Sequence, residues 1–97
     1  MPRILVVEDE EHLAIGIKFN LEAEGFVVTT AGDGQTALDL LAAADPPIDL
    51  VVLDLMLPGM SGFDVLAKLR QDPDTAGVAV LMLTARKDEP DRIRGLE

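Results

Sequence analysis

The chain contains no cysteine, no tryptophan and no tyrosine, and its only aromatic residues are Phe19, Phe26 and Phe63. Without cysteine it can form no disulfide and carry out no thiol chemistry, which is consistent with a reducing cytoplasm. Because aromatics are so few, the hydrophobic core must be aliphatic. The length of 97 residues and the 48% hydrophobic content predict one globular domain covering residues 1–97.

Basic residues are also scarce, since eight Lys and Arg stand against 18 Asp and Glu, for a net charge of −10. We therefore expect no direct binding to nucleic acid by this chain and no attraction to anionic membranes. No apolar run approaches the length of a transmembrane helix, and the start "MPRILVVEDEE" is too short and acidic for a signal peptide. These features predict a soluble, cytoplasmic protein.

Short apolar runs alternate with stretches of helical periodicity along the whole chain. This alternation, with short connections, predicts an α/β fold in which helices cover both faces of a parallel sheet. Such sheets bind ligands at the carboxyl ends of their strands. We expect strands at 3–7, 26–30, 49–54 and 78–83, and helices at 9–25, 33–44, 62–71 and from about 88 onward.

Local signals mark the ends of these helices. Gly25 suits a C-terminal cap, Asp33 an N-terminal cap, and Ser61 with Asp64 forms a capping box. The stretch "GDGQTA" (32–37) contains G-x-G without a third glycine, and it follows the second strand. We interpret it as a turn and a helix cap and not as a dinucleotide-binding loop.

Oxygen-bearing side chains gather where the strands end. Glu8 and Asp9 follow the first strand, Asp54 ends the third, and Thr84 follows the fourth. One acid at a strand end is usually a helix cap or a solvated loop residue, but several strand ends share one edge of a parallel sheet. Clustered carboxylates repel one another unless a hard cation lies among them, so the pattern predicts an Mg²⁺ site beside a phosphoryl-transfer centre.

The chain resembles the receiver domain of bacterial two-component response regulators, in particular those of the OmpR/PhoB type. The resemblance runs from Ile4 to Glu97. It implies a flavodoxin-like (CheY-like), doubly wound parallel sheet of strand order 2-1-3-4-5. The stretches that carry it are "ILVVEDE", "LEAEGF", "DLVVLDLMLPGMSG", "VLMLTAR" and "DRIRGLE".

The resemblance also implies a role for each site residue. Asp54 corresponds to the residue that accepts a phosphoryl group from a sensor histidine kinase, and Thr84 to the switch hydroxyl. The Mg²⁺ ligands would be Glu8, Asp9, Asp54 and the main-chain carbonyl of Met56. A receiver catalyses its own phosphorylation and dephosphorylation, is not a classical enzyme, and controls an output that is here expected to be transcription.

The chain departs from the family pattern at its end. The family has a fifth strand, a fifth helix and a lysine that contacts the phosphoryl group, whereas this chain has only Lys18, Lys68 and Lys87 and stops at Glu97 within an expected helix. We expect a C-terminally incomplete fragment, although a natural short protein remains an alternative. The fourth strand, 78–83, would then be an exposed apolar edge that favours a homodimer or other self-association.

Two further readings stay open. A degenerate receiver that acts only as a protein–protein interaction module is the alternative to a phosphorylatable one. A small phosphatase is disfavoured because Met56 stands where a second acid is needed. On the helix over 9–25, Ile15 and Phe19 lie opposite the stripe that packs on the sheet, and they could dock a kinase or pack on a fifth helix.

Overall fold

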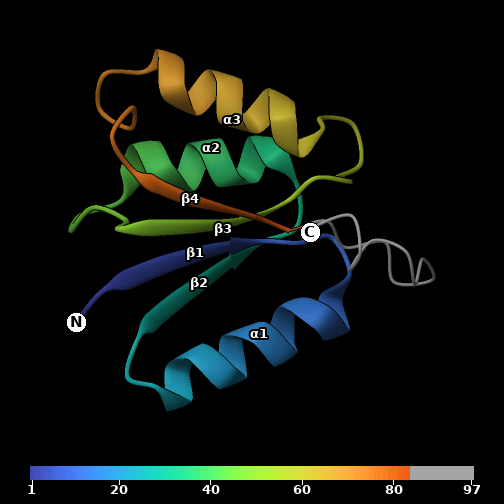
Figure 1. The fold of residues 1–97 in the computed structure, drawn as a ribbon, viewed down its shortest axis with the longest axis vertical. Coiled ribbons are helices and arrows are strands. Elements are labelled where there is room, and N and C mark those ends of the chain that lie inside the picture. The colour runs from blue at the N-terminus through green and yellow to red at the C-terminus, as the bar shows by residue number, and fades with distance from the viewer. Residues whose placement is uncertain (84–97) are drawn as a thin grey trace, which may run out of the picture.

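The protein is described by a computed structural model in which residues 1–83 are placed, and they form a parallel sheet between two layers of helices (Figure 1). The sheet order is β2-β1-β3-β4 and every pairing is parallel, which confirms the fold class and the order 2-1-3-4. The strands are β1 (Arg3–Val7), β2 (Val27–Ala31), β3 (Leu50–Asp54) and β4 (Ala79–Leu83), and the helices are α1 (Glu11–Ala23), α2 (Gly34–Ala43) and α3 (Gly62–Gln71).

Thr84 and the helix expected from about residue 88 lie outside the described residues, as does any element beyond them. Among the described helices, none combines the length and the hydropathy that a bilayer-spanning segment requires. The four expected strands and three of the expected helices are confirmed, with boundaries that differ by at most two residues.

The two faces of the sheet have separate aliphatic cores. Helices α2 and α3 cover one face and α1 covers the other (Figure 1). Alternate residues of a strand point to opposite faces. Leu5 of β1 and Leu53 of β3 therefore belong to the core under α2 and α3, whereas Val6 and Val52 belong to the core under α1. Burial on both faces explains why β1 and β3 are continuous apolar runs.

Polar side chains close the helix ends as the sequence predicts. Asp33 accepts a hydrogen bond from the backbone N–H of Thr36 at 2.8 Å, and Ser61 Oγ accepts one from Asp64 N–H at 3.2 Å. The hydrogen bonds from Thr36 lower the pKa of the Asp33 carboxyl group below its usual value. Gly25 has a φ of +96°, a left-handed conformation that favours glycine after a helix.

Helix α1 begins two residues later than predicted, because Glu10 is its N-cap and accepts a hydrogen bond from the N–H of Leu13. The residues before Glu10 therefore form a short loop at the end of β1. In the sheet register, Val7 lies beside Leu53, so the next residue of each strand, Glu8 and Asp54, meet at the same edge. The strand order reverses between β1 and β3, and ligands of such sheets bind at that point.

Candidate metal and phosphoryl-transfer site

Three carboxylates converge at the carboxyl edge of the sheet. Glu8, Asp9 and Asp54 each place a carboxylate oxygen within 4.8 Å of the other two. Two of them follow β1 and one ends β3, so residues more than forty positions apart meet only because the strands are parallel neighbours. Two ligands of one octahedral Mg²⁺ ion lie about 2.9–4.2 Å apart when each bond is about 2.1 Å. The 4.8 Å bound on the cluster is slightly wider than this, so the carboxylates would draw closer around an ion, and a set of three carboxylates is the donor chemistry that a hard divalent cation prefers.

Backbone hydrogen bonds hold two of these carboxylates in place. Glu8 Oε2 accepts a hydrogen bond from the N–H of Glu10 at 2.9 Å, at the start of α1. Asp54 Oδ1 accepts one from the N–H of Met56 at 3.0 Å. Each carboxylate is thus oriented by the loop that follows its own strand, so the lengths of these two loops set the geometry of the cluster.

Two of the three carboxylates in the cluster are buried, and a nearby positive charge would stabilise them. Glu8 and Asp54 are each 1% exposed, whereas Asp9 is exposed to solvent. A buried carboxylate is costly unless it is paired or coordinates a metal. Within residues 1–83 the ion pair between Lys18 and Glu22 lies on the surface of α1 and does not involve the cluster. A bound divalent cation would offset the repulsion among the three carboxylates.

Asp54 is almost fully shielded from solvent, although the turn at Pro58–Gly59 follows its strand closely. The turn is present, and Gly59 has a φ of +77°. The chain then returns, however, and the N–H of Gly62 donates a hydrogen bond to the carbonyl of Leu55 at 3.0 Å. This return packs the start of α3 against the end of β3, and the exposed member of the cluster is Asp9.

Gly62 is a positioning residue that the sequence reading missed. A Cβ atom at this position would overlap the carbonyl oxygen of Asp54 and lie 2.8 Å from the Cα atom of Leu55. Only glycine therefore lets α3 begin so close to the backbone of Asp54. The sequence does carry one indication of this role. Gly62 directly follows the capping Ser61, where a residue with better helix propensity is ordinarily preferred.

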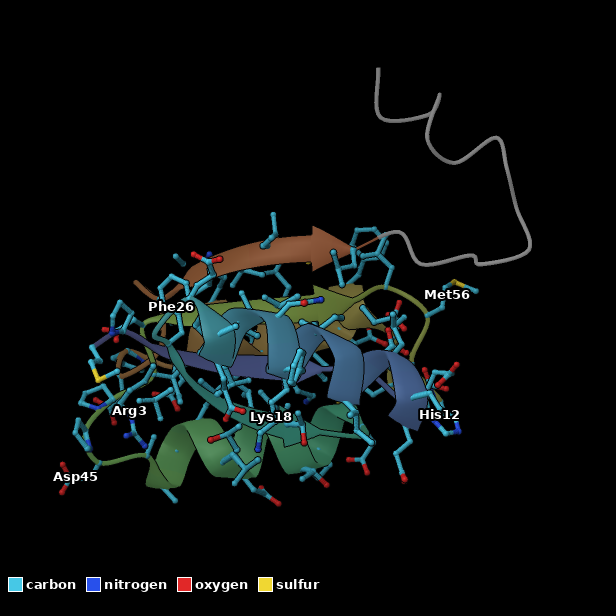
Figure 2. The ribbon with its side chains drawn as sticks, turned by 90° about the horizontal axis from the view of Figure 1, so that it is seen from below. Arg3, His12, Lys18, Phe26, Asp45 and Met56 are labelled. Atoms are coloured by element: carbon cyan, nitrogen blue, oxygen red, sulfur yellow. The ribbon has the colours of Figure 1, made fainter. Side chains whose placement is uncertain are left out.

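Met56 lies next to the cluster, but the observed contact is made by its N–H group. The expected role of its carbonyl as a metal ligand stays a prediction. Its side chain is 56% exposed, and Figure 2 places Met56 and His12 at the same end of the sheet. His12 is exposed on α1. The switch hydroxyl expected at Thr84 lies outside the described residues.

A cavity of about 160 Å³ adjoins the cluster on the side of β2. Glu8 and Asp9 line it together with Glu11 of α1, and the opposite wall is formed by Thr30 and Gly32 at the end of β2. The cavity gives water or a small polar group a route toward the buried carboxylate of Glu8.

Comparison with known proteins agrees with this geometry. A family model described as the response regulator receiver domain matches residues 4–97. The chain is 49% identical over 96 residues to the phosphate regulon transcriptional regulatory protein PhoB of Rhizobium meliloti, covering 99% of this chain and 41% of that protein. It is 50% identical over 97 residues to the transcriptional regulatory protein CpxR of Escherichia coli (strain K12), covering all of this chain and 39% of that one.

Solved structures of receiver domains share the fold. The N-terminal domain of a response regulator receiver protein from Methanoculleus marisnigri JR1 gives a TM-score of 0.82 at 36% identity, covering 96% of this chain and 74% of that chain. The chemotaxis response regulator CheY4 of Vibrio cholerae gives 0.82 at 28% identity, covering 97% and 76%.

The chain spans about two fifths of the length of the curated relatives, 41% and 39%. Both relatives are transcriptional regulators by name and belong to the OmpR/PhoB type that the sequence resembles. The sheet order, the acidic cluster at its carboxyl edge and the match over nearly the whole chain lead to one conclusion: this chain belongs to the response regulator receiver domain family.

Proposed function

We propose that this chain accepts a phosphoryl group on Asp54 from a phosphohistidine of a sensor kinase, in a reaction that depends on Mg²⁺. The observation that carries the proposal is the cluster of Glu8, Asp9 and Asp54 within 4.8 Å, with Asp54 held at the end of a central strand. A surface acid without such neighbours would have no reason to be buried and oriented in this way.

The hydrogen bonding of Asp54 assigns different roles to its two oxygens. Oδ1 accepts the N–H of Met56, which restrains the carboxylate. Oδ2 makes no hydrogen bond with a described residue, so it is the oxygen that attacks phosphorus. The new bond joins this oxygen to phosphorus, the phosphorus–nitrogen bond breaks, and its electron pair returns to the imidazole, which leaves neutral after taking a proton. The product is an aspartyl phosphate.

Mg²⁺ would be held by Glu8, Asp9 and Asp54, with the Met56 carbonyl as the expected fourth protein ligand. The ion supplies charge neutralisation for the transferring phosphoryl group. The protein's own contribution is positioning, because the β-sheet fixes Asp54 on β3 beside Glu8 on β1. Thr84 is proposed as the hydroxyl that responds to the phosphoryl group.

Labelling by a small phosphodonor tests the assignment of Asp54. Mass spectrometry after incubation with acetyl phosphate and Mg²⁺ should find one added phosphoryl group, and Asp54→Ala should abolish it. Asp39→Ala is the matched control, because Asp39 is an exposed acid on α2 far along the chain from the cluster. Unchanged labelling of Asp54→Ala would show that another residue is the acceptor.

Thermal melting with and without Mg²⁺ tests the metal site. A ligand that binds only the folded state stabilises it by about 1.4 kcal/mol when its free concentration is about ten times its dissociation constant. Asp54→Asn removes one of two adjacent buried anions, so without Mg²⁺ it should melt at the same temperature or higher. The variant should also lose the stabilisation by Mg²⁺. If both proteins gained equally from Mg²⁺, the ion would bind elsewhere.

The partners follow from the same proposal. A sensor histidine kinase would donate the phosphoryl group, and the phosphorylated state would control transcription through a longer protein. Ile15 and Phe19 are 56% and 72% exposed on α1 and form a candidate apolar contact for the kinase. We also propose self-association through β4, which pairs with β3 alone among the described strands. Under this proposal both interactions would take place in the cytoplasm.

The competing function is a receiver that only binds partners. The acetyl phosphate experiment separates the two functions. A chain that binds Mg²⁺ but accepts no phosphoryl group would be an interaction module.

A further inference from the structure

A second cavity lies at the opposite end of the sheet from the acidic cluster. Its volume is about 250 Å³, and it lies between the start of β1, the middle of β2 and the C-terminal end of α2. Leu5, Leu40 and Ile48 supply apolar walls, and Arg3 and Asp45 supply the charges. Figure 2 shows Arg3 and Asp45 at the end of the molecule that is remote from Met56.

Arg3 has an unmet hydrogen-bonding requirement in this cavity. Its Nε atom is buried, yet it has no hydrogen-bond partner among residues 1–83. The backbone N–H of Arg3 donates to Asp49 Oδ2 at 2.8 Å, and the N–H of Asp49 donates to the Arg3 carbonyl at 2.8 Å. These bonds hold the backbone of β1 and involve no atom of the guanidinium group, so they leave its buried Nε without a partner among residues 1–83. Buried polar atoms in folded proteins are almost always hydrogen bonded, so this atom requires an acceptor.

The acids nearby do not supply that acceptor. Asp45 lines the cavity but is exposed, and the single ion pair of the described chain joins Lys18 to Glu22. Arginine offers a planar fork of N–H donors that matches a carboxylate, and such charge-assisted pairs are stronger than neutral hydrogen bonds. The apolar walls beside the guanidinium would accept a hydrocarbon group. The site thus combines an anion-binding group with a small apolar chamber.

We propose that this cavity binds a small amphipathic monocarboxylate, with the carboxylate on the Arg3 guanidinium and the short apolar tail against Leu5, Leu40 and Ile48. The volume limits the ligand to on the order of eight non-hydrogen atoms, at about 30 Å³ for a water-sized group. Drug-sized ligands need cavities of roughly 300 Å³ or more, so larger molecules are excluded. The proposal is independent of phosphorylation, because the cavity shares no residue with the acidic cluster.

An NMR titration of the whole chain with hexanoate tests the proposal, and hexan-1-ol is the uncharged control of similar size. Hexanoate should shift the amide signals of Arg3, Leu5 and Ala44 in a saturable way, with a dissociation constant on the order of millimolar for so small a ligand. Hexan-1-ol should bind at least about tenfold more weakly. The titration is run at physiological ionic strength, which screens the long-range repulsion from the acidic chain.

Variants of the two charged residues sharpen the test. Arg3→Gln should weaken hexanoate binding about tenfold or more without changing the affinity for hexan-1-ol. Asp45→Asn, which removes a like charge from the cavity wall, should strengthen hexanoate binding. If Arg3→Gln does not fold, the affinities of the two ligands are compared on the unaltered chain and on Asp45→Asn. This comparison still decides whether the cavity recognises the carboxylate group.

Two results would overturn the proposal. Equal binding of hexanoate and hexan-1-ol would reduce the site to an apolar cavity without carboxylate recognition. The absence of saturable shifts at these three amides would mean that water alone satisfies Arg3.

Discussion

Replacing Gly62 with alanine should destabilise the protein, although alanine is ordinarily the better residue in a helix. The added Cβ would overlap the carbonyl oxygen of Asp54 and lie 2.8 Å from the Cα atom of Leu55. Nonbonded carbon atoms are ordinarily about 3.5–4.0 Å apart, so the first turn of α3 must move by roughly 0.7 Å or more. The opposing atoms belong to the backbone at the end of β3 and of the residue that follows it. Backbone atoms cannot rotate away as a side chain can.

Overpacking of this kind costs about 1–3 kcal/mol. Helix propensity offsets this by at most roughly 1 kcal/mol, because alanine is favoured over glycine within a helix. The net loss should therefore lie between about 0 and 3 kcal/mol and centre on about 1.5 kcal/mol, and that central value lowers the melting temperature of a domain of this size by roughly 6–12 °C. Because the added Cβ presses on the backbone of Asp54 and Leu55, phosphoryl labelling should slow as well.

Gly16→Ala provides a matched control. Gly16 lies within α1, and an added Cβ there would meet nothing within 4 Å. The same substitution should therefore stabilise the protein by about 0.5–1 kcal/mol. Both variants are compared by thermal melting and by the rate of labelling with acetyl phosphate. If Gly62→Ala melted at or above the temperature of the unaltered chain, the close approach of α3 to Asp54 would be refuted.

Three other perturbations have clear expected outcomes. Leu53→Ala removes a fully buried side chain from the core under α2 and α3 and should cost about 2–5 kcal/mol in urea unfolding, whereas a loss below 1 kcal/mol would mean that the core collapses around the gap. Asp33 has a lowered pKa in the folded protein, so the stability from its cap is complete above its unfolded pKa of about 3.9 and disappears as the pH falls through the folded value. Asp33→Asn keeps a capping oxygen without a titrating charge, so its stability should fall less between pH 5 and 3; parallel pH profiles would contradict this. Leu81 is 54% exposed on β4, whereas the preceding residue, Val80, packs against the core, so Leu81 is the position at which self-association can be blocked without disturbing the core. Leu81→Lys should abolish any dimer seen by sedimentation at tens of micromolar, and a monomeric unaltered chain would remove the basis for edge pairing.

The boundaries of the elements followed from the sequence because their causes are local. A capping side chain such as Asp33 or Ser61 acts on a backbone N–H three positions away. The apolar runs of β1 and β3 identify strands buried on both faces, and parallel strands place their carboxyl ends at one edge. Convergence of Glu8, Asp9 and Asp54 could therefore be predicted. The two-residue shift at the start of α1 arose because Glu10, and not an earlier acid, is the cap.

Burial within the site depended on the tertiary structure. Nothing near Asp54 in the sequence shows that it is 1% exposed while Asp9 remains exposed, because this depends on how closely α3 returns to the end of β3. That approach requires Gly62, whose neighbours in space are backbone atoms seven and eight positions earlier. The unsatisfied Nε of Arg3 likewise depends on how α2 packs against β1 and β2. Local patterns specify which groups reach an edge, whereas packing between distant elements decides which of them water can still solvate.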